Sequence, residues 1–139
     1  MKIKTAKILL LISGILMIIS GITDICMLGM GVYYQKYDFH ELKHVIDFIL
    51  SIVNIIFFIG GGCAGIFVFC RCNYKNICRA FQYGIVILAF AIIDTVNVLA
   101  TAIANQQFDI LGITLVLVFV FFPTVYTIGA FILKKEWDN

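Results

Sequence analysis

Ionisable side chains are rare inside the long apolar runs of this sequence. Asp24 and Asp94 each lie within such a run, and Asn54 and Asn97 lie at comparable places. A carboxylate surrounded by hydrocarbon is costly, so residues of this kind are functional candidates by default. No Lys, Arg or His lies within the runs. The two carboxylates therefore cannot both stay ionised at low cost, and one or both are expected to have a raised pKa or to hold a cation.

The spacing of these polar residues places them on stripes along three expected helices. Residues three, four or seven positions apart share one face of a helix. The stripes are Ser13, Ser20 and Asp24; then Asp47, Ser51 and Asn54; then Asp94, Asn97 and Thr101. We predict that Asp24, Asp47, Ser51, Asn54, Asp94 and Asn97 form an outward-facing polar site for a cation, a proton or an amine-bearing ligand. The alternative is that protonated aspartates join helices through hydrogen bonds, each worth about 0.6–2 kcal/mol.

The segment His40-Glu41-Leu42-Lys43-His44 matches the H-E-x-x-H pattern of zinc proteases. On a helix, two histidines at this spacing share a face and bind zinc, while the glutamate activates water. Asp47 falls on the same face, so His40, His44 and Asp47 are candidate ligands for a divalent metal. Lys43 departs from the uncharged residues usual between the histidines, and the chain offers no soluble domain for a substrate cleft. Solvated histidines at the start of an interfacial helix are the alternative.

Three cysteines cluster in the middle polar stretch, at positions 70, 72 and 78. Their thiols could bind zinc or Cu(I), although a fourth ligand is missing. Cysteines next to a membrane helix are also candidates for S-palmitoylation, and ordinary free thiols are the third possibility.

The elements that must position these residues follow from composition. Hydrophobic residues make up 63% of the 139-residue chain and charged residues 13%, far from the balance of a soluble domain. Apolar runs of about 20 residues cross a bilayer as helices. Four runs qualify, at about 8–33, 45–69, 80–104 and 110–133. The first also resembles a secretory signal, but it continues too far and no A-x-A site follows. We therefore predict an all-α membrane protein, one four-helix transmembrane domain over 1–139.

Lys and Arg near the runs predict the orientation, because they favour the cytoplasmic side. They gather before the first run, between the second and third, and after the fourth, whereas the first loop has only Lys36 and Lys43 beside two acids. The prediction is a multi-pass protein of the cell membrane with cytoplasmic N- and C-termini. Short connections then favour an antiparallel up-down-up-down bundle. Small residues at 14, 21, 61 and 65 suit helix packing within the chain or between copies. Pro123 is a candidate hinge, or a tolerated packing kink.

Two segments resemble a known family. They are residues 8–16, ILLLISGIL, and residues 122–130, FPTVYTIGA, followed by Lys134 and Lys135. Both are similar to segments of small four-helix (tetraspan) membrane proteins of Gram-positive bacteria. The similarity covers most of the chain in pattern, and the family brings no known chemistry. The glutamate of the small multidrug transporters has no counterpart, since Asp24 stands later and in a different context.

Three functions remain open. The first is an oligomeric transport or channel-type subunit, because a lone four-helix bundle leaves little room for a pore. The second is a non-catalytic accessory protein bound to a larger membrane partner. The third is a membrane metalloenzyme using His40, Glu41 and His44. We lean away from an enzyme and expect no cofactor apart from a possible divalent metal. The expected partners are the lipid bilayer and either a second copy or a larger membrane protein. The net charge of +2 and the lack of a basic run argue against nucleic acid.

Overall fold

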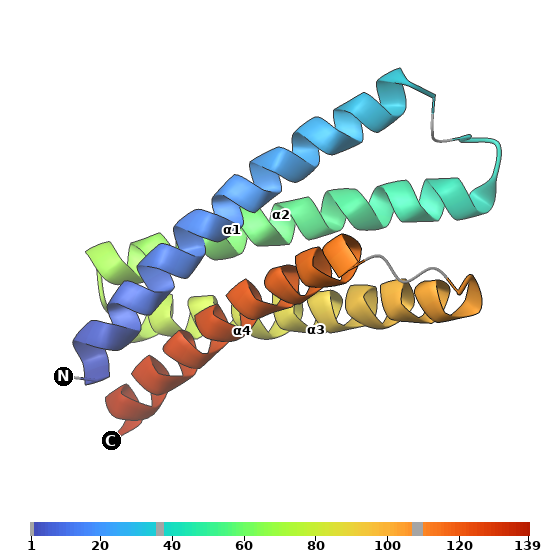
Figure 1. The fold of residues 1–139 in the computed structure, drawn as a ribbon. Helices are drawn as coiled ribbons and strands as arrows, with labels where there is room; N and C mark the ends of the chain where they lie inside the picture. Colours follow the sequence, from blue (N-terminus) through green and yellow to red (C-terminus); the bar gives the residue numbers. More distant parts are fainter. Residues whose placement is uncertain (1, 36–37, 107–109) are drawn as a thin grey trace.

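The computed structural model describes residues 2–35, 38–106 and 110–139, with their side chains except those of residues 115 and 119. Over these ranges the chain is helical and contains no strand (Figure 1). The helices are α1 (Lys2–Tyr33), α2 (Leu42–Cys70), α3 (Tyr74–Ala104) and α4 (Ile110–Asp138). Each is long and apolar enough to cross a membrane, which confirms the four predicted helices. Lys36, used above in the orientation argument, lies outside the described residues.

The two ends of the chain lie at the same end of the molecule (Figure 1). The connection between α2 and α3, residues 71–73, lies there as well, and we call this the terminal end. At the opposite end, which we call the open end, α1 and α3 finish and α2 and α4 begin. Each polar stretch of the sequence therefore lies at one end of the helices, as a membrane-crossing chain requires.

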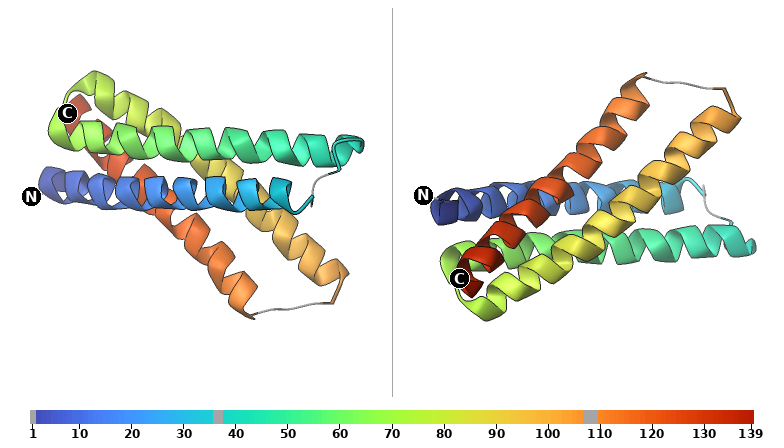
Figure 2. Two further views of the ribbon diagram at one scale, coloured as in Figure 1. Left: turned by 90° about the horizontal axis from the view of Figure 1, so that it is seen from above. Right: turned by 90° about the horizontal axis from the view of Figure 1, so that it is seen from below.

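The helices are arranged as two crossed hairpins rather than as one bundle of even width. Within each pair, α1 lies beside α2 and α3 beside α4. Both views of Figure 2 show the hairpins meeting at the terminal end and diverging toward the open end. The buried core lies where the two hairpins meet, because all of its members come from the helix halves nearer the terminal end. They are Ala6, Leu10, Met17, Phe58, Val68, Ile77, Ala80, Ile87, Tyr126, Ala130 and Leu133.

Glycines bring α1 and α2 into backbone contact within the terminal half. A Cβ added at Gly14 would lie 2.9 Å from the Gly62 carbonyl oxygen, and one at Gly62 would lie 2.5 Å from the Gly14 oxygen. Gly65 likewise faces the Tyr126 ring and the Leu10 carbonyl. Small residues permit such close approach, which gives dispersion contacts without a hydrophobic driving force. These contacts support packing within the chain as the role of the small residues.

Tyr126 joins the two hairpins at the centre of the core. Its side chain is fully buried, and its hydroxyl donates a hydrogen bond of 2.5 Å to the Gly61 carbonyl of α2. Pro123 lies one turn earlier, buried inside α4, which continues through it. The Thr127 hydroxyl donates to the Pro123 carbonyl at 2.7 Å, and the Thr124 hydroxyl to the Val120 carbonyl at 2.8 Å. Such hydroxyl bonds serve the backbone groups around a proline inside a membrane helix. The hinge role of Pro123 stays a prediction.

Candidate functional site

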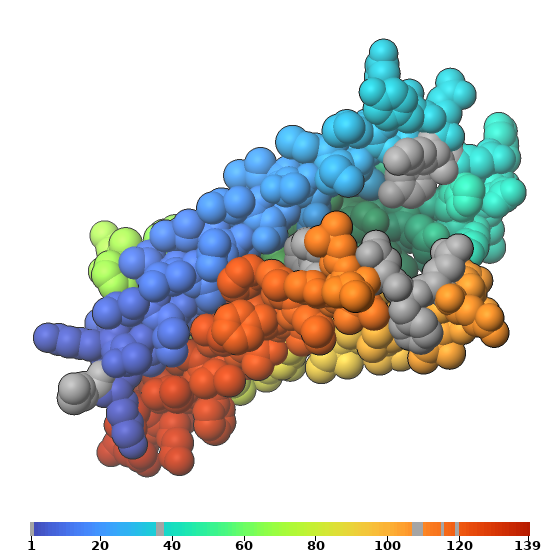
Figure 3. All heavy atoms as spheres, viewed as in Figure 1, coloured from blue at the N-terminus to red at the C-terminus, as the bar shows by residue number. Residues whose placement is uncertain are grey.

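Asp24, Ser51 and Asn54 meet in a hollow between the open-end halves of α1 and α2. The hollow has a volume of about 440 Å³ and is also lined by Met27 and Tyr34. All three polar residues are half-buried. Figure 3 shows the molecule recessed at this end, with α2 visible at the bottom of the recess between α1 and the start of α4. The structure thus brings Asp24 of the first predicted stripe to the same hollow as Ser51 and Asn54 of the second.

Helix geometry explains why these side chains face each other. Asp24 lies seven residues after the buried Met17 and three after Gly21, whose added Cβ would lie 2.7 Å from Ile59 of α2. It therefore continues the face of α1 that packs on α2. Asn54 lies four residues before the buried Phe58 and continues the interior face of α2 in the same way.

Asn54 has an unmet hydrogen-bonding capacity. Its Oδ1 atom is buried and has no partner among the described residues. A buried acceptor left unpaired costs about 1–3 kcal/mol, and buried polar atoms in folded proteins are nearly always paired. Because Asn54 also lines the hollow, an unpaired acceptor of this kind suits a group that arrives from outside the chain.

Among the described residues, the polar side chains that line the hollow offer oxygen atoms, and none of them is a Lys, Arg or His. The Ser51 hydroxyl donates its proton to the Asp47 carbonyl at 2.9 Å, so its lone pairs remain for a ligand. The Asp24 carboxylate and the Asn54 oxygen also accept. Oxygen ligands with a net negative charge suit a metal cation or an ammonium group.

The remaining predicted members of the site lie elsewhere. Asp47, Asp94 and Asn97 are exposed, and none of them lines the hollow. Asp94 does continue the buried face of α3, three residues after Ala91 and seven after Ile87. Asp94 belongs to the open-end half of α3, and the hairpins diverge toward that end (Figure 2).

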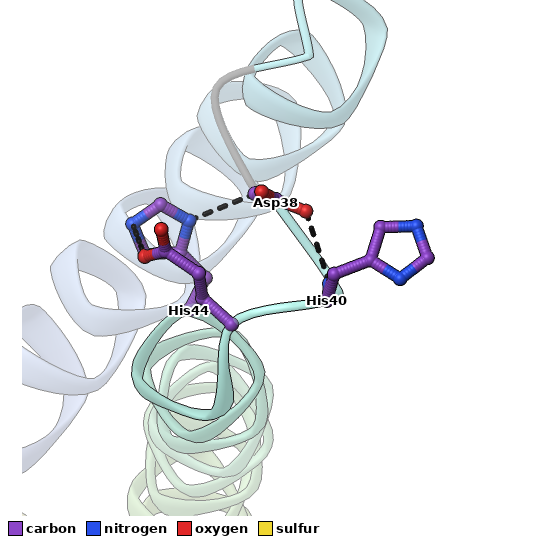
Figure 4. Close-up of polar contacts among 4 residues, drawn as sticks. Asp38, His40 and His44 are labelled. Carbon is purple, nitrogen blue, oxygen red and sulfur yellow. Dashed lines mark hydrogen bonds and ion pairs between the residues drawn. The ribbon is translucent and has the colours of Figure 1, made fainter.

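The H-E-x-x-H segment lies at the open end, and its two histidines do not share a helix. α2 begins at Leu42, so His40 precedes the helix and His44 lies in its first turn. The Asp38 backbone N–H donates to His44 Nδ1 at 2.8 Å, the His40 N–H donates to Asp38 Oδ1 at 3.0 Å, and His44 Nε2 lies 3.7 Å from Glu41. In Figure 4 the His40 ring points away from His44. Among the described residues no group of three metal-ligating side chains converges. Metal binding stays a prediction, and it would require His40 to turn toward His44.

The cysteines are free thiols. Cys70 is exposed, whereas Cys72 and Cys78 are half-buried near the connection between α2 and α3. Tyr34 and Met27 of the hollow were not singled out from the sequence. Met27 could have been found from the spacing, since it lies three residues after Asp24 on α1, whereas Tyr34 lies just beyond the end of that helix.

Comparison with protein-family models, with curated proteins and with solved structures finds no match to the chain. What the fold defines is a class: a helical protein with four helices suited to crossing a membrane. The resemblance to Gram-positive tetraspan proteins stays a prediction.

Proposed function

We propose that this chain is a multi-pass membrane protein that binds a cation between α1 and α2 and acts as one subunit of an oligomeric transport or channel-type assembly. One observation carries the proposal: the unpaired Asn54 oxygen shares a hollow with the Asp24 carboxylate and the Ser51 hydroxyl. An intramembrane carboxylate facing a cavity is typical of ion and proton pathways.

The orientation proposed from the flanking charges puts this hollow on the outer side. The helices then cross up-down-up-down, with the terminal end in the cytoplasm. A reporter fused after Asn139 tests this orientation, because it should be protected from protease in intact cells. Digestion of the reporter in intact cells would mean that the termini lie outside and that the hollow faces the cytoplasm.

The oligomer is supported by the shape of a single chain. The hairpins diverge toward the open end (Figure 2), and Asp94, in the open-end half of α3, is exposed in a single chain. An exposed carboxylate at that depth is costly against lipid, so a second copy that covers it would remove a penalty.

The test is cation uptake into liposomes containing the purified protein, with sodium and methylammonium as probes. Wild-type protein should take up at least one of them. Asp24→Asn should reduce this uptake by a factor of ten or more, because Asp24 is the only carboxylate among the described residues that line the hollow. Asp47→Asn is the matched control, since Asp47 lies on the neighbouring turn of α2 but outside the hollow. Equal uptake by wild type and Asp24→Asn, or no uptake of either probe, would remove the transport proposal.

An accessory role is the second candidate, and the same open space favours it. A helix of a larger membrane protein would fill the space between the hairpins as well as a second copy does. Purification from native membranes in mild detergent separates the two. One dominant companion protein in fixed ratio supports the accessory role, and self-association alone supports the transport assembly.

A further inference from the structure

A larger groove lies between α2 and α3 at the terminal end, away from the candidate cation site. Its volume is about 1250 Å³. Polar side chains line the part near the helix ends, and apolar side chains line the part nearer the middle of the helices. The polar lining includes Arg71, Arg79 and Gln82, and the apolar lining includes Phe57, Phe67 and Val86.

The two arginines bring positive charge that the described part of the protein does not neutralise. Both are exposed, and no described carboxylate forms an ion pair with either of them; the one ion pair found joins His44 and Glu41 at the other end. A pair of guanidinium groups at one mouth of a groove matches a phosphate, because each presents a planar set of N–H donors.

The local backbone fixes where Arg71 stands. Its N–H donates to the Phe67 carbonyl at 2.7 Å, and its carbonyl accepts from the Asn76 side chain at 2.9 Å. Asn73 caps α3 by accepting from the Asn76 N–H at 2.8 Å. The connection is therefore an ordered turn, with Arg71 directly after α2 and Arg79 in the second turn of α3, and both arginines line the groove.

The length of the groove fits half a bilayer. Fourteen residues of α2 separate Phe57 from Arg71, which corresponds to a rise of about 21 Å. The hydrocarbon core of a bilayer is about 30 Å thick, so a groove that starts at the headgroups and has this length reaches the midplane. Gly60, Cys63 and Ala64 line the α2 side, and such short side chains leave room for an acyl chain.

We propose that this groove is a binding site for one anionic glycerophospholipid. The phosphate lies between Arg71 and Arg79, Gln82 adds a hydrogen bond below it, and an acyl chain runs along α2 past Cys63 toward Phe57. Basic pockets between membrane helices on the cytoplasmic side recognise anionic headgroups in this way. A soluble phosphate would use the arginines but would leave the apolar wall uncovered. The proposal rests on the membrane insertion proposed above and not on the cation site.

The test counts lipids that stay bound when the protein is released from nanodiscs of equal phosphatidylglycerol and phosphatidylcholine into a native mass spectrometer. Wild-type protein should retain phosphatidylglycerol selectively. The double variant R71Q/R79Q should lower the ratio of retained phosphatidylglycerol to phosphatidylcholine by roughly thirtyfold, about fivefold per arginine. The control K4Q/K7Q removes the same charge at the same end from α1, and its ratio should stay within about twofold of wild type.

A second variant tests the acyl part. Cys63→Trp fills the groove without touching the arginines, so it should reduce retained phosphatidylglycerol while glycerol phosphate still binds. Circular dichroism establishes that each variant is folded, and the single variants R71Q and R79Q replace the double one if it is not. An unchanged lipid ratio in the arginine variants, or an equal loss in K4Q/K7Q, overturns the proposal. Retention by Cys63→Trp together with displacement by inorganic phosphate also overturns it, in favour of a soluble anion. Asp24→Asn does not touch the groove, so the cation site and the lipid site can fail separately.

Discussion

Asn54 is the residue at which the structure departs most from what a folded interior requires. Its buried Oδ1 atom has no partner among the described residues, although Asp24 and Ser51 share the same hollow. The Asn54 Oδ1 atom and the Asp24 carboxylate both accept, so these oxygens pair with each other only if a proton or a cation stands between them. A cation there would bind both helices through oxygen ligands, whereas a proton on Asp24 would give an interhelical hydrogen bond.

This argument predicts the sign of a stability change. Asn54→Leu keeps the volume and removes the unpaired acceptor, so the ligand-free protein should gain about 1–3 kcal/mol in its free energy of unfolding. Cation binding at the hollow should be lost in the same variant. Unfolding in detergent followed by circular dichroism, with and without the cation, measures both effects.

Asn97→Leu is the control for this prediction. Asn97 has the same side chain but is exposed on α3 and does not line the hollow. Its replacement should leave cation binding unchanged. A loss of stability above about 1 kcal/mol in Asn54→Leu would contradict the prediction, because it would mean that Asn54 makes a hydrogen bond within the protein.

At the scale of helices, the contact between α1 and α2 depends on two glycines that face each other. Any side chain at Gly14 meets the Gly62 carbonyl at 2.9 Å, and backbone cannot move aside as a flexible side chain can. Gly14→Ala should therefore destabilise the protein by about 1–3 kcal/mol through overpacking. Thermal unfolding in detergent measures the change.

The same helix offers a matched control at Gly29. A Cβ there would meet nothing within 4 Å, so Gly29→Ala should be neutral or should stabilise by up to about 1 kcal/mol through helix propensity. Equal effects of the two substitutions would mean that α1 and α2 do not touch at Gly14.

The sequence predicts well where the helices lie, but it predicts only in part which of their polar side chains come together. Apolar length defines each span, because lipid forces the backbone to pair within its own segment. The helices extend past the apolar runs, to Lys2 and Asp138, since backbone pairing continues wherever the residues allow it. The stripe spacing places Asp24 and Asn54 on helix faces that line one hollow in the structure.

Two further predictions could not be made safely from the spacing of residues along one helix, because they depend on how distant segments meet and on where a helix begins. The meeting of Asp94 with Asp24 depends on how the hairpins cross, and contacts between the hairpins, such as the Tyr126 hydrogen bond to Gly61, lie in other parts of the chain. The shared helical face of His40 and His44 depends on where α2 begins. The Asp38 contact with His44 occupies the turn before Leu42, so His40 stays outside the helix.

At the scale of the whole molecule, the crossed hairpins leave part of the inner face of α3 uncovered. The core is confined to the terminal half, and the face of α3 that buries Ile87 and Ala91 continues to Asp94 without a partner from α1 or α2. Lipid is a poor solvent for that carboxylate. Water in the space between the hairpins would solvate it, but a second copy would also cover the apolar walls beside it.

The proposed assembly therefore predicts where two copies touch. In a variant without the native cysteines, Asp94→Cys should be linked into dimers by a short bismaleimide in native membranes, because position 94 lies on the face that a second copy covers. Ile85→Cys is the control: Ile85 is exposed on α3, two residues before Ile87 and thus on another face, and it should remain monomeric. Gel electrophoresis separates the products. Cross-linking at neither position, together with a monomeric mass in detergent, would contradict self-association and leave a different membrane protein as the partner that fills the space between the hairpins.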